Sequence, residues 1–144
     1  MPKIERSVTI NAPVKKIFDY IADPKLQVEW LPGMIEVKDI KQTEQGVGST
    51  YKFAYKVAGM RFEGEDTVEE YIPNKKMVTR SKGGIESSWT WNFEPYNDKI
   101  KVEVIVEYKV PIPVLGKIAE VLVLKQNERE ADHALANIKD KMEN

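Results

Sequence analysis

The C-terminal part of the chain constrains the fold most, because a strand pattern gives way there to one long helical pattern. The junction runs from Tyr108 to Lys117 and contains a Pro-x-Pro sequence. We expect the strand to end at Pro111 and the helix to begin near Val114, because proline is tolerated at a helix start but not in its interior. A helix that reaches Met142 would be about 43 Å long.

This helix changes character along its length. Its first half is apolar on nearly every side, which predicts burial on several sides. Its second half is charged, with an apolar stripe at three- and four-residue spacing: Val121, Leu124, Glu128, Ala131, Leu135, Ile138 and Met142. The charged member, Glu128, lies either at the mouth of a cavity or extends to water.

The rest of the chain reads mainly as strands. An alternating pattern at Ile4–Ile10 precedes two short helices. Their starts are marked by Asn11-Ala12-Pro13 and Asp23-Pro24, in which we expect Asn11 and Asp23 to cap the helix ahead of the proline. Turn residues then separate six strands: Ile35–Thr43, Thr50–Ala58, Arg61–Tyr71, Met77–Ser81, Ser87–Glu94 and Ile100–Val110. This order predicts one α+β domain over residues 1–144, with an antiparallel sheet and helices gathered on one side.

Aromatic residues share one face of several predicted strands, at the period of two that strands require. They are Tyr51, Phe53, Tyr55, Trp89, Trp91, Phe93 and Tyr108. Singly, each is explained by core packing. Together, on a twisted sheet that curls beneath a single helix, they indicate the lining of an apolar pocket.

The chain resembles the START-like helix-grip (SRPBCC) superfamily, in particular its polyketide cyclase/dehydrase and lipid-transport branch. The resemblance covers essentially the whole chain and rests on short motifs in order: Ile10-Asn-Ala-Pro13, Ile17-Phe18, Asp23-Pro24, Trp30-Leu-Pro-Gly-Met34, Gly48-Ser-Thr-Tyr51, Glu70-Tyr71-Ile-Pro73 and the Tyr108–Lys117 junction. It implies a curved antiparallel sheet of about seven strands wrapped around the long helix, with an internal hydrophobic cavity. The family includes lipid and sterol carriers, ubiquinone-binding proteins, hormone receptors and aromatase/cyclases. No catalytic residue is carried over from it.

Composition narrows the function further. The formal net charge is -1 and basic residues are spread along the chain, which argues against nucleic-acid binding. The chain has no cysteine and one histidine, His133, which we place on the outer face of the helix. We therefore expect no metal and no cofactor. No apolar run spans a membrane, and we expect a cytoplasmic monomer or weak homodimer.

The predicted ligand-binding residues face the inside of the curl or the cavity side of the helix: Phe53, Tyr55, Phe62, Val68, Trp89, Trp91, Val104, Tyr108, Val121, Leu124 and Glu128. Asp66 is the one candidate catalytic residue. Its strand places Gly64, Asp66 and Glu70 inward, unless a bulge near Glu69 turns Glu70 out. Gly64 would leave space above the sheet. Arg80, on the next strand, is a possible partner for Asp66, and an ion pair at the sheet rim is the alternative interpretation.

Three functions follow from these patterns. The first is binding or transport of a hydrophobic small molecule such as a lipid, isoprenoid or polyketide-like compound. The second is a polyketide cyclase or dehydratase, in which Asp66 with Tyr55 or Tyr108 supplies acid–base chemistry. The third is a protein-interaction or stress-related adaptor that uses the outer sheet or the loop Trp30–Ile35. That loop either packs under the first strands or gates the cavity.

Overall fold

The computed structural model describes the backbone of residues 3–57, 59–83, 85–109 and 112–144, and the side chains of these residues except 57 and 112–123. The elements in chain order are β1 (Lys3–Ile10), α1 (Val14–Ala22), the 3-10 helix η1 (Pro24–Leu26), α2 (Gln27–Trp30), β2 (Met34–Lys41), β3 (Thr50–Val57), β4 (Met60–Ile72), β5 (Lys76–Lys82), β6 (Ser87–Tyr96), β7 (Lys99–Tyr108) and α3 (Ile112–Glu143). The predicted order and nearly all predicted bounds are confirmed to within a few residues.

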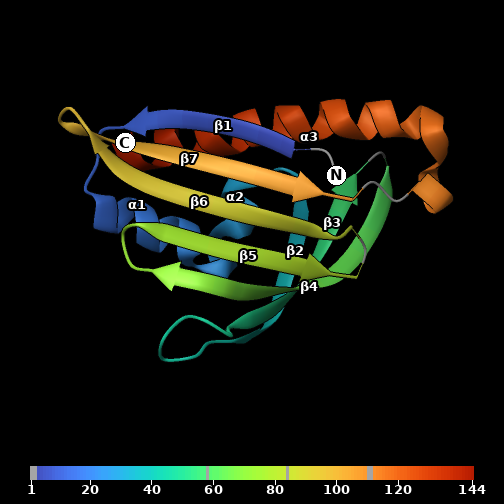
Figure 1. The fold of residues 1–144 in the computed structure, drawn as a ribbon, viewed down its shortest axis with the longest axis horizontal. Coiled ribbons are helices and arrows are strands. Elements are labelled where there is room, and N and C mark those ends of the chain that lie inside the picture. Colours follow the sequence, from blue (N-terminus) through green and yellow to red (C-terminus); the bar gives the residue numbers. More distant parts are fainter. Residues whose placement is uncertain (1–2, 58, 84, 110–111) are drawn as a thin grey trace.

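The strands form one antiparallel sheet in the order β1-β7-β6-β5-β4-β3-β2. Hairpins connect the successive strands from β2 to β7. Strand β2 forms one edge of the sheet, and β1 forms the other edge by pairing with β7. Asn74 and Asn97 adopt left-handed backbone conformations, with φ of 66° and 53°, at two of the predicted turns. The sheet curls, and α3 runs along its β1 side (Figure 1).

The last turns of α3 are fixed to the N-terminal elements by polar contacts. Lys139 Nζ donates to the Thr9 carbonyl at 2.6 Å, and the Glu143 carboxylate accepts from the Asn11 amide at 2.9 Å. Ile138, one residue before Lys139, is fully buried. The helix therefore closes one end of the curled sheet, as the sequence predicted. The side chains of its apolar first half, including Val121, lie outside the described residues.

The start of α1 differs from the prediction. Its N-cap is Pro13, and no side chain caps the helix, so the prediction that Asn11 caps it is wrong. Proline itself occupies the cap position, and Asn11 lies two residues too early to reach the first turn. The equivalent prediction for Asp23 is confirmed, because its carboxylate accepts from the Lys25 amide at 3.1 Å.

The bulge in β4 is present where it was expected. Register against β5 shifts between Val68 and Glu70, so Glu70 turns outward and pairs with Lys76 at 3.2 Å. Upstream of the bulge, Asp66 and Val68 are buried on the inner face. The space predicted above Gly64 is filled, because a side chain there would collide with the Phe53 ring and the Lys82 carbonyl.

Candidate functional site

A cavity lies between the inner face of the sheet, α2 and α3. Strands β3 to β7 supply most of its wall, and Gln27, Trp30, Asn127 and Glu130 close it from the helices. The apolar remainder of the wall is Ile4, Ile21, Leu31, Met34, Met77, Ile85 and Val106. The cavity volume, counted as the space that the centre of a water molecule can occupy, is about 80 Å³. One water needs roughly 10–15 Å³ by this measure, so the cavity holds several waters or a small organic group.

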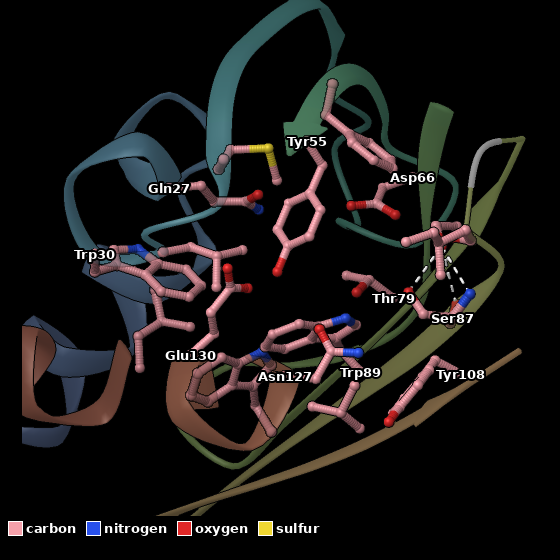
Figure 2. A pocket seen from close by; sticks show the side chains of 18 of the residues that line it. Gln27, Trp30, Tyr55, Asp66, Thr79, Ser87, Trp89, Tyr108, Asn127 and Glu130 are labelled. Atoms are coloured by element: carbon pink, nitrogen blue, oxygen red, sulfur yellow. Dashed lines mark hydrogen bonds between the residues drawn. The ribbon is translucent and has the colours of Figure 1, made fainter. Parts of the chain in front are cut away.

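Tryptophans form the cavity's largest flat surfaces. Trp89 and Trp91 stack with ring centroids 6.2 Å apart, and Trp30 meets Trp91 edge-on at 5.5 Å. Trp91 is only 2% exposed, whereas Trp89 is half-buried and projects toward the cavity (Figure 2). The three rings give the site a rigid apolar wall, which is what binding of an apolar ligand requires.

A buried polar chain crosses the wall between α2 and β4. Gln27 Nε2 donates to the Tyr51 hydroxyl at 2.6 Å, and Tyr51 is hydrogen-bonded to Asp66. Asp66 is 9% exposed. Burial raises the pKa of its carboxyl to about 6, against a smaller opposing effect of the Tyr51 hydrogen bond. Burial also raises the pKa of Tyr51 well above its ordinary value.

A second carboxyl, Glu130 of α3, faces the same cavity. It is 7% exposed, and Oε1 accepts from Gln126 Nε2 at 3.3 Å. Its Oε2 is buried and has no hydrogen-bond partner among the described residues. Burial raises the pKa of this carboxyl to about 7. Figure 2 shows the carboxylate pointing toward the Tyr55 hydroxyl.

Gly33 makes the approach of these two side chains possible. A Cβ at this position would lie 2.7 Å from Glu130 Oε1 and 2.6 Å from Tyr55 Cζ. Both side chains therefore pack directly against the backbone of the segment that joins α2 to β2. That segment mostly faces inward, since Trp30, Leu31 and Met34 are buried and line the cavity; Ile35, in contrast, is exposed.

Most predicted site residues come together in this cavity. Those that line it are Phe53, Tyr55, Phe62, Trp89, Trp91, Tyr108 and the candidate catalytic residue Asp66. Val68 and Val104 are buried in the core instead, and Leu124 and Glu128 are half-buried on α3 without lining the cavity. Val121 lies in the part of α3 whose side chains are not described.

The proposed pairing of Asp66 with Arg80 is wrong. Arg80 points to the outer face, where its guanidinium contacts the Glu69 carboxylate at 3.1 Å. Thr79 and Ser81, its neighbours in β5, face inward and are buried. No salt bridge to Asp66 is found among the residues that the structure describes. His133 is exposed, as predicted.

Sequence reasoning missed Gln27, Thr79 and Glu130. Glu130 lies three residues after Asn127 and four before Ala134, and these three share the inward side of α3. The helical spacing is visible in the sequence, but a charged residue beside an apolar stripe is usually exposed to solvent. Gln27 belongs to a single helical turn, which is too short for periodicity to reveal a face.

The described part of the chain contains no cluster of three or more metal-ligating side chains. Nor does it contain a helix that is long and apolar enough to cross a membrane. The residues that line the cavity offer apolar contact, hydrogen bonding to a few polar groups, and two carboxyls whose raised pKa values suit proton transfer near neutral pH.

The curled sheet, the long C-terminal helix and the cavity between them define a helix-grip protein. A family model described as polyketide cyclase / dehydrase and lipid transport matches residues 1–143. The chain belongs to that family. A search of curated protein sequences finds no match.

Solved structures agree on the fold. The crystal structure of TTHA0849 from Thermus thermophilus is similar at a TM-score of 0.83 and 17% identity, over 98% of this chain and 97% of that one. The Zhui aromatase/cyclase from Streptomyces sp. R1128 has a TM-score of 0.75 and 16% identity, over 99% and 93%. The Aha1 dimer from Colwellia psychrerythraea has a TM-score of 0.66 and 18% identity, over 99% and 97%.

Proposed function

We propose that residues 1–144 form one domain that binds or carries a hydrophobic small molecule, such as a lipid, isoprenoid or polyketide-like compound. The observation that carries the proposal is the cavity itself, whose wall is mostly aromatic and aliphatic with a few convergent polar groups. The proposed contacts are the predicted residues that line it: Phe53, Tyr55, Phe62, Trp89, Trp91 and Tyr108. The domain acts as a monomer or weak homodimer in the cytoplasm, without nucleic acid or cofactor.

A variant that fills the cavity tests this function. Thr79 is buried and lines the cavity, whereas Val78 lies on the opposite face of the same strand. Thr79→Phe should fill most of the open volume, and Val78→Phe adds the same ring outside it. Binding is measured by calorimetry and by native mass spectrometry with a panel of neutral lipids, isoprenoids and aromatic ketones. Wild type and Val78→Phe should bind a panel member that Thr79→Phe does not bind. Equal binding by all three would place the ligand elsewhere.

A polyketide cyclase or dehydratase is the second candidate, and the two cavity carboxyls favour it. Such a reaction removes a proton next to a ketone and protonates a departing or forming hydroxyl. Asp66 and Glu130 face one cavity, and burial raises the pKa of both toward neutrality. A group with a pKa near the working pH serves as either acid or base. Turnover of a poly-β-ketone that survives both Asp66→Asn and Glu130→Gln would exclude these residues from the chemistry.

A further inference from the structure

The cavity has an uneven charge balance. Its described lining includes two carboxyl side chains, Asp66 and Glu130, and no lysine, arginine or histidine. Neither carboxylate forms a salt bridge among the described residues, and Arg80, which would be near Asp66, is turned to the outer face. Two buried anions without a cation are unfavourable, because water no longer solvates them.

Glu130 also has an unused acceptor that faces the cavity. Its Oε2 is buried and receives no hydrogen bond from any described residue, although the carboxylate points into the open space near Tyr55 (Figure 2). Buried polar atoms are nearly always hydrogen-bonded. A hydrogen-bond donor on a molecule in the cavity would satisfy this oxygen.

The surrounding rings add a second preference. Trp30, Tyr55, Trp89 and Trp91 all line the same space. The faces of such rings attract a cation, most strongly where water is excluded. Carboxylates and aromatic faces together favour a positively charged group over a neutral one, and both disfavour an anion.

We propose that the ligand is a hydrophobic amine, with an apolar body against the tryptophans and an ammonium group that pairs with Glu130. The proposal rests on the proposed function of the cavity and adds the chemical class of its ligand. An ammonium group donates up to three hydrogen bonds, enough for Glu130 Oε2 and a further acceptor. Two amide side chains would hydrogen-bond to a neutral ligand equally well and would cost less to desolvate than two carboxyls. The two carboxyls therefore favour binding of a positively charged ligand.

Three probes share one naphthyl ring and differ in the charge of the terminal group, so they separate the effect of charge on affinity from that of the apolar body. They are naphthylethylamine, naphthylethanol and naphthylacetate. Calorimetry near neutral pH should rank the amine at least about tenfold above the alcohol, which is what one charge-assisted hydrogen bond supplies. The acetate should bind more weakly than the alcohol. Glu130→Gln should remove most of the preference for the amine while the alcohol binds as before. Glu128→Gln, two residues away and outside the cavity lining, should change neither.

The pH dependence gives a readout that needs no variant. The titratable groups that face the cavity from the sheet and α3 are Asp66, Glu130, Tyr51, Tyr55 and Tyr108. Burial raises the pKa of the Asp66 carboxyl to about 6 and that of the Glu130 carboxyl to about 7. The amine stays protonated from about pH 5 to about pH 8, so its affinity should rise over that range as the carboxyls ionise. The affinity of the alcohol should stay nearly constant.

The outcomes distinguish the two proposals. If the alcohol binds and the amine binds no better, the hydrophobic site stands and the amine proposal is refuted. Tightest binding of the acetate would refute it equally. If none of the probes binds, the proposed function itself is contradicted, and the amine proposal with it.

Discussion

Replacing Asp66 by asparagine should stabilise the protein at neutral pH. The carboxyl has a pKa of about 6 in the fold against an ordinary 3.8, a difference of about 2. Each pKa unit corresponds to about 1.36 kcal/mol, so ionising Asp66 in the folded state costs about 3 kcal/mol. Asparagine keeps the shape and an acceptor for the Tyr51 hydroxyl but carries no charge.

The sign of the pH dependence follows from the raised pKa. Between about pH 4 and about pH 6 the folded state holds a proton that the unfolded state has lost, so the free energy of unfolding falls as pH rises. Above the pKa of Asp66 in the folded state, the free energy of unfolding has fallen by the full amount. The Asp66→Asn variant has no carboxyl at this position, so its free energy of unfolding lacks this dependence on pH. The variant should therefore gain about 3 kcal/mol relative to wild type between about pH 4 and about pH 7.

Urea unfolding at several pH values measures this difference directly. Glu65→Gln is the matched control, because Glu65 precedes Asp66 in β4 and is exposed on the outer face. Its difference from wild type should change little with pH. The reasoning is refuted if the difference in unfolding free energy between Asp66→Asn and wild type is the same at both ends of the pH range. It is also refuted if wild type becomes more stable relative to the variant as pH rises.

Four further substitutions test separate parts of the site. Trp89→Ala should weaken binding of a neutral hydrophobic probe about tenfold or more by calorimetry, while Trp91→Ala should also lower the unfolding free energy by about 3–5 kcal/mol, because Trp91 is fully buried. If both variants bind the probe as tightly as wild type, the two rings serve only to pack the core. Gly33→Ala should destabilise the fold by about 1–3 kcal/mol in urea, since its methyl group meets the Tyr55 ring; an unchanged midpoint would contradict the close packing. Arg80→Ala should cost under about 1 kcal/mol and leave the titration of Asp66, followed by carboxyl NMR shifts, unaltered; a shifted titration would mean that the two residues are coupled.

The sheet could be predicted because several of its strands, β3, β6 and β7 above all, alternate between an apolar and a polar face. The residues Tyr51, Val102, Val104 and Val106 mark the buried face, since successive strand side chains point to opposite sides. Asp66 could be placed by the same counting, and only Glu70, beyond the bulge, needed a separate argument. The arrangement of strand, helices, meander and long helix then left few alternatives for the fold.

Other parts of the site depend on facts that local patterns do not contain. In β5 the inward residues Thr79 and Ser81 are polar, so alternation did not show which way Arg80 pointed. On α3 the apolar stripe includes Glu128, but the helix is rotated enough that Glu130 faces the cavity. Which of two nearby glutamates becomes buried is decided by how α3 docks on β1 and α2, a tertiary contact that the helix sequence alone does not encode.

The position of a bound probe tests the central claim most directly. Intermolecular NOEs can be measured between naphthylethanol and the protein's aromatic and methyl protons by NMR. If the cavity binds hydrophobic molecules, the probe should show NOEs to the indole protons of Trp89 and to Met34, which both line the cavity. NOEs confined to exposed residues such as Ile35 or Tyr96, with none to the tryptophans, would contradict it.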